Sequence, residues 1–261
     1  MRSLRAVTSA GRPSDDPGAR AREHRNSAHA AICDVLEPWA HGTVVRAARY
    51  PSFWDFNVVR VEEEPRMSVD ELVEFADEAL AGLPHRRVDF DQAAGAESVR
   101  AEFEAKGWRS ERLVWMRLAS PPAPGPAIAV EEVPYDAAHD LRVAWHREDF
   151  PGVDLGGHVD DAREVAMRLG AHVLAVEEAG STVGFAQFER QGQTGEVTHV
   201  YVHPDRRGAG YGTALTRAAI EAAGDARDLW IIADDEGRPK NLYARLGFRP
   251  AWILTQFLRV P

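Results

Sequence analysis

Apolar and polar residues follow two different periods along residues 128–261. Short runs of β-branched and aromatic residues predict buried strands at four places: 173–177, 183–188, 197–202 and 228–233. Apolar residues at helical spacing predict helices at 136–148, 162–169 and 212–223. Pro239 fits the first turn of a further helix. Strands and helices mixed in this order predict an α/β sandwich.

The first half of the chain repeats this pattern at a spacing of about 140 residues. A predicted helix stops at Gly107, and an aromatic residue, an arginine and a strand follow it. The same order follows Gly247. Further upstream, a strand at 56–61 and a helix at 69–80 match the strand at 197–202 and the helix at 212–223. We therefore expect two tandem copies of one fold.

A proline-rich segment, residues 119–127, separates the two copies. Its four prolines and small residues cannot continue a helix or a central strand. We expect a first domain at 30–118 and a second domain at 128–261. Residues 1–29 are rich in Arg, Ser and Ala and lack the apolar segment of a secretory signal. They are predicted to be a disordered tail or an over-extended start.

The segment 200–215 carries the clearest chemical signal, because it reads as a strand, a glycine-rich turn and a helix. The glycines of the turn are Gly208, Gly210 and Gly212. Glycine permits positive φ and close backbone approach, and a helix start presents unpaired N–H groups that bind phosphate. Positive charge is added by Arg206 and Arg207. The turn lacks the lysine of a Walker loop and the glycine spacing of a dinucleotide loop. It therefore predicts a pyrophosphate cradle.

This segment resembles motif A of the GNAT superfamily of N-acyltransferases, in which Arg207, Gly210 and Gly212 fill the fixed positions. The segment from Leu242 to Phe248 resembles motif B, and the resemblance covers about 130 residues. It implies the GNAT fold, an α/β fold in which helices flank a mixed, mostly antiparallel sheet, here in two tandem copies. It also implies an acyl-coenzyme A co-substrate, most often acetyl-CoA, and no metal. The binding residues that it implies are Val200, Tyr201, Val202, Arg207, Gly208, Ala209, Gly210, Tyr211, Gly212 and Thr213. The strand that holds the first three is expected to bend away from its neighbour and pair with the pantetheine arm.

The resemblance also implies a catalytic acid and a base. Tyr243 stands where the family places a tyrosine that faces the cofactor sulfur, so it is the candidate acid; the alternative is a core tyrosine. Glu196 stands where histone-acetylating members carry a catalytic glutamate, so it is the candidate base; the alternative is a solvated carboxylate. Strand alternation predicts that Glu196, Thr198 and Val200 share one face and that His199 points to the other.

The first copy lacks the glycine cradle, since Met67, Val69 and Glu71 stand at the corresponding positions. It resembles a degenerate GNAT domain, and we expect it to act structurally or to wall the substrate cleft. The acceptor amine is expected near the aromatic and acidic segment 145–150, where aromatic and acidic side chains can receive a cation.

The net charge, the length of the apolar runs and the number of cysteines exclude further classes of protein. The net charge of −10 argues against nucleic-acid binding, and no apolar run is long enough to cross a membrane. The single cysteine, Cys33, allows no disulfide framework and favours a cytoplasmic protein. We therefore expect an N-acetyltransferase that moves an acetyl group from acetyl-CoA directly to a primary amine of a small-molecule or peptide acceptor. The alternative is a non-catalytic acyl-CoA-binding regulatory module. The identity of the acceptor, the acyl length and the oligomeric state stay open.

Overall fold

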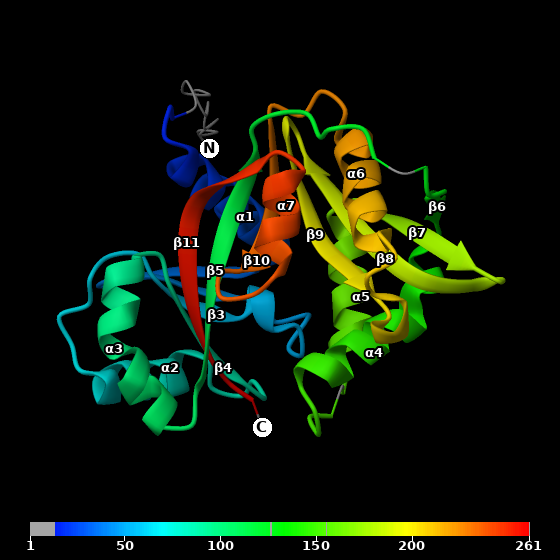
Figure 1. The fold of residues 1–261 in the computed structure, drawn as a ribbon. Coiled ribbons are helices and arrows are strands. Elements are labelled where there is room, and N and C mark those ends of the chain that lie inside the picture. Colours follow the sequence, from blue (N-terminus) through cyan, green and yellow to red (C-terminus); the bar gives the residue numbers. More distant parts are fainter. Residues whose placement is uncertain (1–13, 126, 155, 261) are drawn as a thin grey trace, which may run out of the picture.

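The computed structural model describes residues 14–125, 127–154 and 156–260. Its strands form one eleven-stranded sheet in the order β1-β2-β3-β4-β11-β5-β10-β9-β8-β7-β6 (Figure 1). Their bounds are β1 Val35–Trp39, β2 Gly42–Arg46, β3 Val58–Val61, β4 Arg86–Phe90, β5 Arg109–Leu118, β6 Glu131–Val133, β7 His172–Glu178, β8 Ser181–Gln191, β9 Thr194–Val202, β10 Asp228–Asp234 and β11 Phe248–Arg259. Among the described strands, β3–β4 and β9–β10 are the parallel pairs, so the sheet is mixed and mostly antiparallel, as the family resemblance implies.

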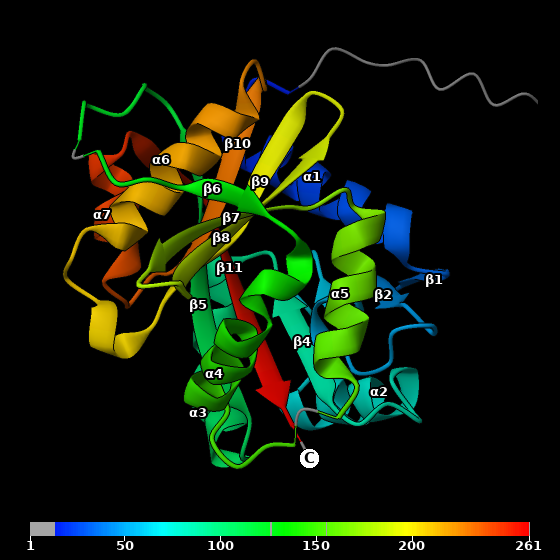
Figure 2. The ribbon, with the colours of Figure 1, turned by 90° about the vertical axis from the view of Figure 1, so that its right-hand side faces the viewer.

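Helices cover both faces of this sheet (Figure 2). They are α1 Pro17–Ile32, α2 Val69–Ala79, α3 Ala93–Ala105, α4 His139–Asp149, α5 His158–Arg168, α6 Tyr211–Ala223 and α7 Pro239–Arg245, with the 3-10 turns η1 Trp54–Phe56, η2 Tyr135–Ala138 and η3 Pro204–Arg206. Helices α2, α3, α6 and α7 pack on one face, and α1, α4 and α5 pack on the other. In this part of the chain, no helix combines the length and the apolar character needed to span a membrane.

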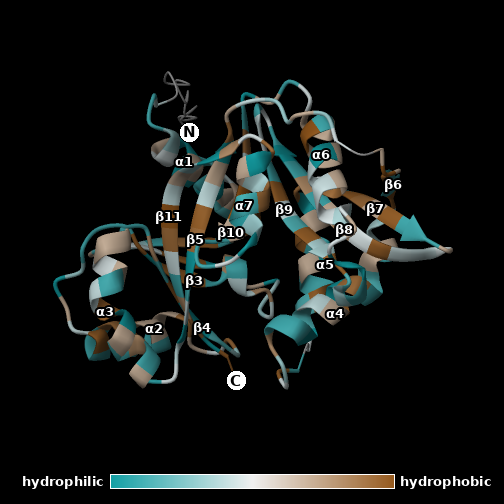
Figure 3. Cartoon of the chain, viewed as in Figure 1, coloured by the Kyte–Doolittle hydropathy of each residue, from teal (hydrophilic) through white to brown (hydrophobic). Residues whose placement is uncertain are grey.

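The core follows the pattern of the sequence. Apolar residues concentrate in the strands, whereas the helices alternate apolar and polar residues (Figure 3). Leu215 and Ala219 of α6 are fully buried on the sheet, which is the spacing of one helix face. Phe103 of α3 stacks on Phe257 of β11 with ring centroids 4.2 Å apart, and it fills the core under α2 and α3.

The two copies have the same order of elements, β3-α2-β4-α3-β5 and β9-α6-β10-α7-β11. The helix that precedes the last strand ends before a left-handed glycine in both, with φ +80° at Gly107 and +98° at Gly247. A Cβ atom at Gly247 would lie 2.1 Å from the carbonyl oxygen of Ser120, so this glycine is also required by close packing. The tandem repeat predicted from the sequence is therefore present in the fold.

The copies exchange their last strands. Strand β11 of the second copy pairs with β4 of the first, and β5 of the first copy pairs with β10 of the second. The two exchanged strands also pair with each other at the centre of the sheet. The predicted boundary at 119–127 therefore divides the sequence but does not separate two compact units in space. Residues 119–125 have no regular secondary structure, and Arg217 of α6 donates a hydrogen bond to the carbonyl of Ala123.

The predicted disordered tail is wrong from Pro17 onward, because these residues form α1; residues 1–13 lie outside the described part of the chain. The Asp16 side chain caps the helix by accepting hydrogen bonds from two amides at 3.0 Å. Arg25 pairs with the buried Asp89 of β4, and Arg20 holds the buried Asp228 of β10 through two hydrogen bonds at 3.0 and 3.3 Å. Helix α1 therefore forms ion pairs with a strand of each copy, β4 of the first and β10 of the second.

Candidate active site

The predicted cradle lies between β9 and α6. Gly208 and Gly210 have φ of +87° and +89°, a conformation that side-chain-bearing residues rarely adopt. The first hydrogen bond of α6 runs from the amide of Ala214 to the carbonyl of Gly210. The amides of Tyr211, Gly212 and Thr213 therefore have no partner within the helix. This geometry supplies a concave row of N–H donors at a positive helix end.

The two arginines before the glycines are held by carboxylates. Arg207 makes two hydrogen bonds to Glu148 of α4, at 2.7 and 2.8 Å, and Arg206 pairs with Glu178 at 2.6 Å. The Arg207 hydrogen bonds lower the pKa of Glu148. The amide of Arg207 donates to the carbonyl of Pro204 at 3.2 Å. The anion-binding capacity of this loop therefore resides in the backbone after Arg207 rather than in these guanidinium groups.

The corresponding place in the first copy is closed. Helix α2 begins after Ser68, whose hydroxyl accepts from the amide of Glu71. The Glu71 carboxylate in turn accepts from the amide of Ser68 at 2.7 Å, and this hydrogen bond lowers its pKa. This capping box occupies the amides that would hold a phosphate and adds negative charge. It agrees with the interpretation of the first copy as degenerate.

Strand β9 separates from β10 halfway along its length. The β9–β10 pairing ends at Val197 and Ile231, whereas the β9–β8 pairing continues to Val202. Thr198 is the extra residue of a β-bulge, because Val197 pairs with Phe188 and His199 pairs with Gln187. The backbone of β9 after the bulge therefore faces a gap in the sheet, as expected for the strand that holds Val200, Tyr201 and Val202.

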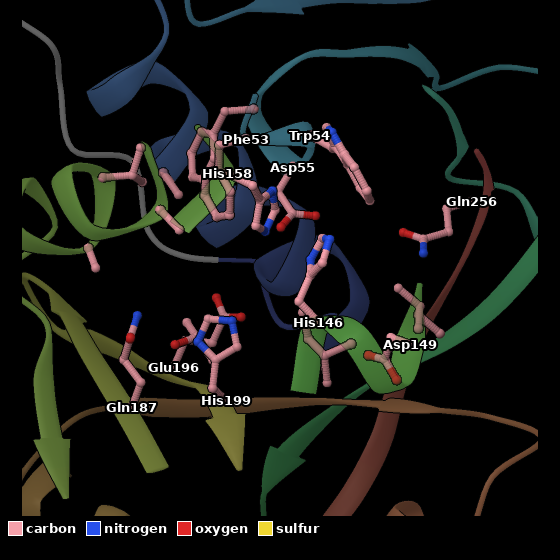
Figure 4. A pocket seen from close by; sticks show the side chains of 18 of the residues that line it. Phe53, Trp54, Asp55, His146, Asp149, His158, Gln187, Glu196, His199 and Gln256 are labelled. Atoms are coloured by element: carbon pink, nitrogen blue, oxygen red, sulfur yellow. The ribbon is translucent and has the colours of Figure 1, made fainter. Parts of the chain in front are cut away.

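The bulge overturns the predicted face of His199. Alternation holds only in an unbroken strand, and the extra residue shifts the later side chains to the opposite face. Glu196 and His199 consequently line the same cavity (Figure 4), while Val200 packs against the apolar core under α6. Of the three residues predicted to share a face, Glu196 and Thr198 reach the cavity and Val200 does not.

That cavity has a volume of about 410 Å³ and lies between the two copies, under α1, α4 and α5. Its walls come from both halves of the chain. Aromatic walls are formed by Phe53, Trp54, Trp145 and Phe150. Imidazoles are contributed by His29, His146, His158 and His199, and carboxyl groups by Asp55, Glu111, Asp149, Glu189, Glu196 and Asp234. Of the segment expected near the acceptor amine, Trp145, His146, Asp149 and Phe150 line the cavity, whereas Glu148 is hydrogen-bonded to Arg207.

Burial keeps the imidazoles of His29, His146 and His199 neutral by lowering their pKa values. It lowers the pKa of His146 to about 4 and that of His199 to about 3, and the positive charge of Arg142 adds to the second shift. His199 is therefore a weak proton acceptor at neutral pH. Burial also raises the pKa of Asp149. Among the residues that the structure describes, no three of the groups that commonly ligate metals are placed to hold an ion.

Glu196 is fixed by a histidine from α1. The Nε2 atom of His24 lies 3.1 Å from the Glu196 carboxylate, and its Nδ1 atom lies 2.8 Å from the hydroxyl of Thr194. Because that hydroxyl donates to the carbonyl of Gln191 at 3.1 Å, it accepts the hydrogen of Nδ1. Nε2 is then left to share a proton with Glu196. His24 is 3% exposed, so this contact orients the carboxylate from behind the cavity.

A second carboxyl group, Glu189, stands directly opposite Glu196 in the β8–β9 ladder. Burial raises its pKa to about 8, and the neighbouring Glu196 carboxylate adds to the shift. Glu189 accepts a hydrogen bond from Gln187 at 2.7 Å. The cavity thus contains two adjacent carboxyl groups, one of which is mainly protonated at neutral pH.

The protonation of Glu189 predicts a dependence of stability on pH. Its pKa is raised in the folded state, so the unfolded chain loses this proton first as pH rises. The contribution of Glu189 to the free energy of unfolding should be fully present below the ordinary pKa of a glutamate and should be lost as pH rises toward 8. Thermal melts between pH 5 and 9 should show a smaller decline for Glu189→Gln than for the wild-type protein. Parallel profiles would show that Glu189 is already ionised in the folded state.

Tyr243 lies on α7 and is 6% exposed. It belongs to the apolar cluster that also contains Val200 and Val202, beside the gap between β9 and β10, and it is not among the cavity-lining residues. Burial raises the pKa of its phenol, so the hydroxyl stays protonated. The structure therefore brings Glu196 and His199 together in the cavity and places Tyr243 on the other side of the sheet.

His24 and Arg142 are site residues that the sequence analysis did not single out. His24 fell in the predicted tail, although the pair Asp16-Pro17 is a helix-start signal and Ala21, Ala28 and Ile32 follow at helical spacing. Arg142 is an arginine within an expected helix, and no motif distinguishes it from a surface residue.

Comparison with known proteins agrees with this geometry. Residues 170–250 match the sequence model of the family described as "Acetyltransferase (GNAT) domain". A mycothiol acetyltransferase of Nocardia farcinica is 40% identical over 91 residues, which cover 34% of this chain and 29% of that protein. A mycothiol acetyltransferase of Actinosynnema mirum is 30% identical over 186 residues, which cover 64% and 61%. The chain thus spans less than two thirds of the length of either relative.

Solved structures share the fold. A conserved protein of unknown function from Staphylococcus epidermidis superposes with a TM-score of 0.64 at 12% identity, over 87% of this chain and 94% of that one. A GCN5-related N-acetyltransferase from Kribbella flavida superposes with a TM-score of 0.58 at 16% identity, over 94% and 96%. The second match extends the likeness over both copies.

Proposed function

Because the chain contains a domain of the GNAT acetyltransferase family, we propose that it transfers an acetyl group from acetyl-CoA directly to the amine of a small acceptor. The observation that carries this proposal is the glycine-rich start of α6 beside the gap between β9 and β10. The cavity of about 410 Å³ opens next to the same strand, and it has the size of a small-molecule site.

The residues present fit acetyl-CoA. The backbone from Gly208 to Thr213 offers N–H donors to a pyrophosphate, and two glycines hold the positive φ that this loop needs. The unpaired edge of Val200–Val202 offers hydrogen-bonding groups to an extended amide-containing chain. Bound acetyl-CoA would supply an acetyl thioester at the gap in the sheet.

Two different side chains would carry out the two proton transfers of the reaction. Glu196, held by His24, is placed to take a proton from the acceptor ammonium, so that a free amine is available for attack. His199 is less suited to this role, because its pKa is lowered to about 3. The Tyr243 hydroxyl stays protonated and holds a proton that it can give to the leaving sulfur. The aromatic walls exclude water from the acceptor.

The proposal is tested by incubating the full chain with acetyl-CoA and a panel of primary amines, with release of free thiol as the readout. Turnover with one amine class and calorimetric binding of one CoA per chain are expected, because the start of α6 has no side-chain cap, whereas a capping box occupies the start of the corresponding helix α2. Binding of CoA without turnover across the panel would favour the non-catalytic regulatory module. Two equivalent CoA sites would contradict the degenerate first copy.

Substitution of Gly210 tests the cradle directly. Valine at φ +89° is strained and moves the backbone amides that hold the pyrophosphate. Loss of two or more hydrogen bonds to a charged group should weaken CoA binding at least about 10–10²-fold in calorimetry. Gly224→Val is the matched control, because Gly224 has φ +56° at the opposite end of α6. Equal losses in the two variants would point to general destabilisation.

Tyr243→Phe separates the acid role from packing. Phenylalanine keeps the ring in the apolar core, so CoA affinity and melting temperature should change little. Turnover should fall about 10²-fold, at the lower end for a general acid, because burial makes this phenol a weaker acid. Steady-state kinetics with one amine acceptor at a fixed concentration measures the kcat of the variant and of the wild-type protein. Unchanged kcat would mean that another group protonates the thiolate.

The first copy completes the cavity, contributing Phe53, Trp54 and Asp55 as well as His29 from α1. This supports a role as the wall of the acceptor site. We also propose a cytoplasmic location, with which the free thiol of Cys33 is compatible, since reduced cysteines persist there.

A further inference from the structure

Arg142 is a buried charge without a counter-ion. It lies on α4, lines the cavity and is 8% exposed. Within the described residues it makes no ion pair, and its Nε and Nη2 atoms are buried without a hydrogen bond. A buried ion in this state is costly, because it loses hydration and gains no opposite charge.

The surroundings hold the guanidinium in place without neutralising it. Its carbon lies 4.0 Å from the ring centre of Tyr135 and 4.5 Å from that of Phe185, so the group is flanked by two aromatic rings. Two carboxyl groups lie in its neighbourhood, Glu189 and Asp136. The pKa of Glu189 is raised to about 8 and this group is hydrogen-bonded to Gln187, while Asp136 is held by Arg163 through two hydrogen bonds. Arg142 is therefore oriented, dehydrated and unpartnered along the edge formed by Nε and Nη2.

That open edge matches a carboxylate. Nε and Nη2 are the two parallel donors with which arginine grips a carboxylate side-on. The same edge does so elsewhere in this chain: Arg20 holds Asp228 at 3.0 and 3.3 Å, and Arg163 holds Asp136 at 2.8 and 3.2 Å. One guanidinium balances one negative charge, which suits a carboxylate better than a phosphate dianion.

The edge also belongs to the acceptor site. Arg142 and Glu196 line the same cavity, and the charge of Arg142 acts on Glu189, which stands opposite Glu196 in the β8–β9 ladder. Further residues of this cavity have buried atoms without a partner: His146 Nε2, Gln187 Oε1, Thr198 Oγ1 and His199 Nδ1. A cavity that holds a cation, an anion and unpartnered donors and acceptors suits a ligand that carries both charges.

We propose that the acceptor is an amino carboxylate, whose carboxylate binds Nε and Nη2 of Arg142 while its ammonium faces Glu196. This inference rests on the proposed acetyl transfer and names the class of its acceptor. The aromatic walls line the same cavity as both charged groups and would receive the apolar remainder of the molecule. Arg142 thus selects the acceptor, and Glu196 activates it.

Matched amines test the proposal. Each L-amino acid with an apolar side chain is compared with its primary amide, which keeps the α-amine and removes the negative charge. Thiol release should show kcat/KM about 10–10²-fold higher for the acid than for the amide, as expected for two charge-assisted hydrogen bonds. Arg142→Gln should abolish this preference, and Arg142→Lys should retain part of it. Arg100→Gln, which removes an arginine that binds the Glu236 carboxylate outside the cavity, should leave the preference intact.

Calorimetric binding tests the role of Arg142 in carboxylate recognition without depending on turnover. N-acetyl-L-phenylalanine and its amide are titrated calorimetrically into the wild-type protein and into Arg142→Gln, and thermal melts verify that the variant is folded. Carboxylate binding that depends on Arg142, without any thiol release, would support the site and reject the transferase. Thiol release with equal acceptance of acids and amides would overturn the carboxylate proposal and leave the transferase standing. Acceptance of O-phosphoethanolamine on a par with β-alanine would also overturn it.

Discussion

Glu196→Gln is expected to lower kcat/KM at neutral pH by about 10²–10⁴-fold, the range for loss of a positioned general base. Glutamine keeps the size of the side chain, and its amide group can donate a hydrogen bond to Nε2 of His24, so the cavity should keep its shape. CoA affinity should not change. As pH rises toward the pKa of the acceptor amine, free amine becomes available and the rate of the variant should partly recover. Kinetics across pH 6–10 measures both effects.

Glu189→Gln is the matched control for this experiment. Glu189 lines the same cavity and faces Glu196, but it is mainly protonated below pH 8 and cannot act as a base there. Its replacement should leave kcat near the wild-type value at pH 7. If Glu196→Gln raises KM and leaves kcat unchanged, Glu196 only attracts the cationic acceptor, since uniform binding alone is then lost.

Phe257→Ala is expected to lower the free energy of unfolding of the whole chain by about 3–5 kcal/mol. Phe257 is fully buried and lies against Phe103 and Phe90, with ring centroids 4.2 and 5.6 Å away. The change removes a large ring from the core of the first copy, although the residue belongs to the last strand of the second. Denaturant titration followed by circular dichroism gives the size of the loss.

The shape of that transition tests the strand exchange. Strand β11 pairs with β4 and β5, and β5 pairs with β10, so neither copy can lose its last strand alone. Wild-type protein and variant should each unfold in one cooperative step, with a lower midpoint for Phe257→Ala. Two separated steps, with only one shifted by the substitution, would show that the copies are independent.

The chemistry of the cradle could be predicted from the sequence because it depends on local rules. A glycine that needs positive φ and a helix that begins beside it are both encoded within a few residues, as in Gly208–Tyr211. The expected pairing edge of β9 follows from the same local segment. The strands and helices of the second copy could be predicted for a similar reason, because the spacing of apolar residues within each segment indicates its type.

The position of His199 could not be predicted, because alternation assumes a regular strand. The bulge at Thr198 depends on pairing with β8, a contact that no local pattern encodes. Helix α1 was missed for a different reason. Its inward-facing residues include His24 and Arg25, which look solvent-exposed until their partners Glu196 and Asp89 are known. The buried position of His24 and Arg25 therefore depends on tertiary ion pairs that sequence analysis cannot predict.

The exchange of β5 and β11 also lay beyond local patterns. Both strands could pair with their own copy or with the other, because the copies have the same order of elements. The choice depends on packing across the centre of the sheet, where Phe257 fits the core formed by Phe90 and Phe103. The sequence predicts which segments are strands, and the three-dimensional structure determines their neighbours.

The exchange has a consequence for synthesis of the protein on the ribosome. Strand β11 leaves the ribosome after every other strand of the sheet. Until then β4 has one open edge, and Phe90 and Phe103 lack the ring that covers them. At about 5–20 residues per second, this interval lasts on the order of ten seconds after β4 is made. The first copy is made first, yet its part of the sheet is completed only after β11 has been made. A nascent chain that stalls before residue 248 would expose an unpaired strand edge to chaperones.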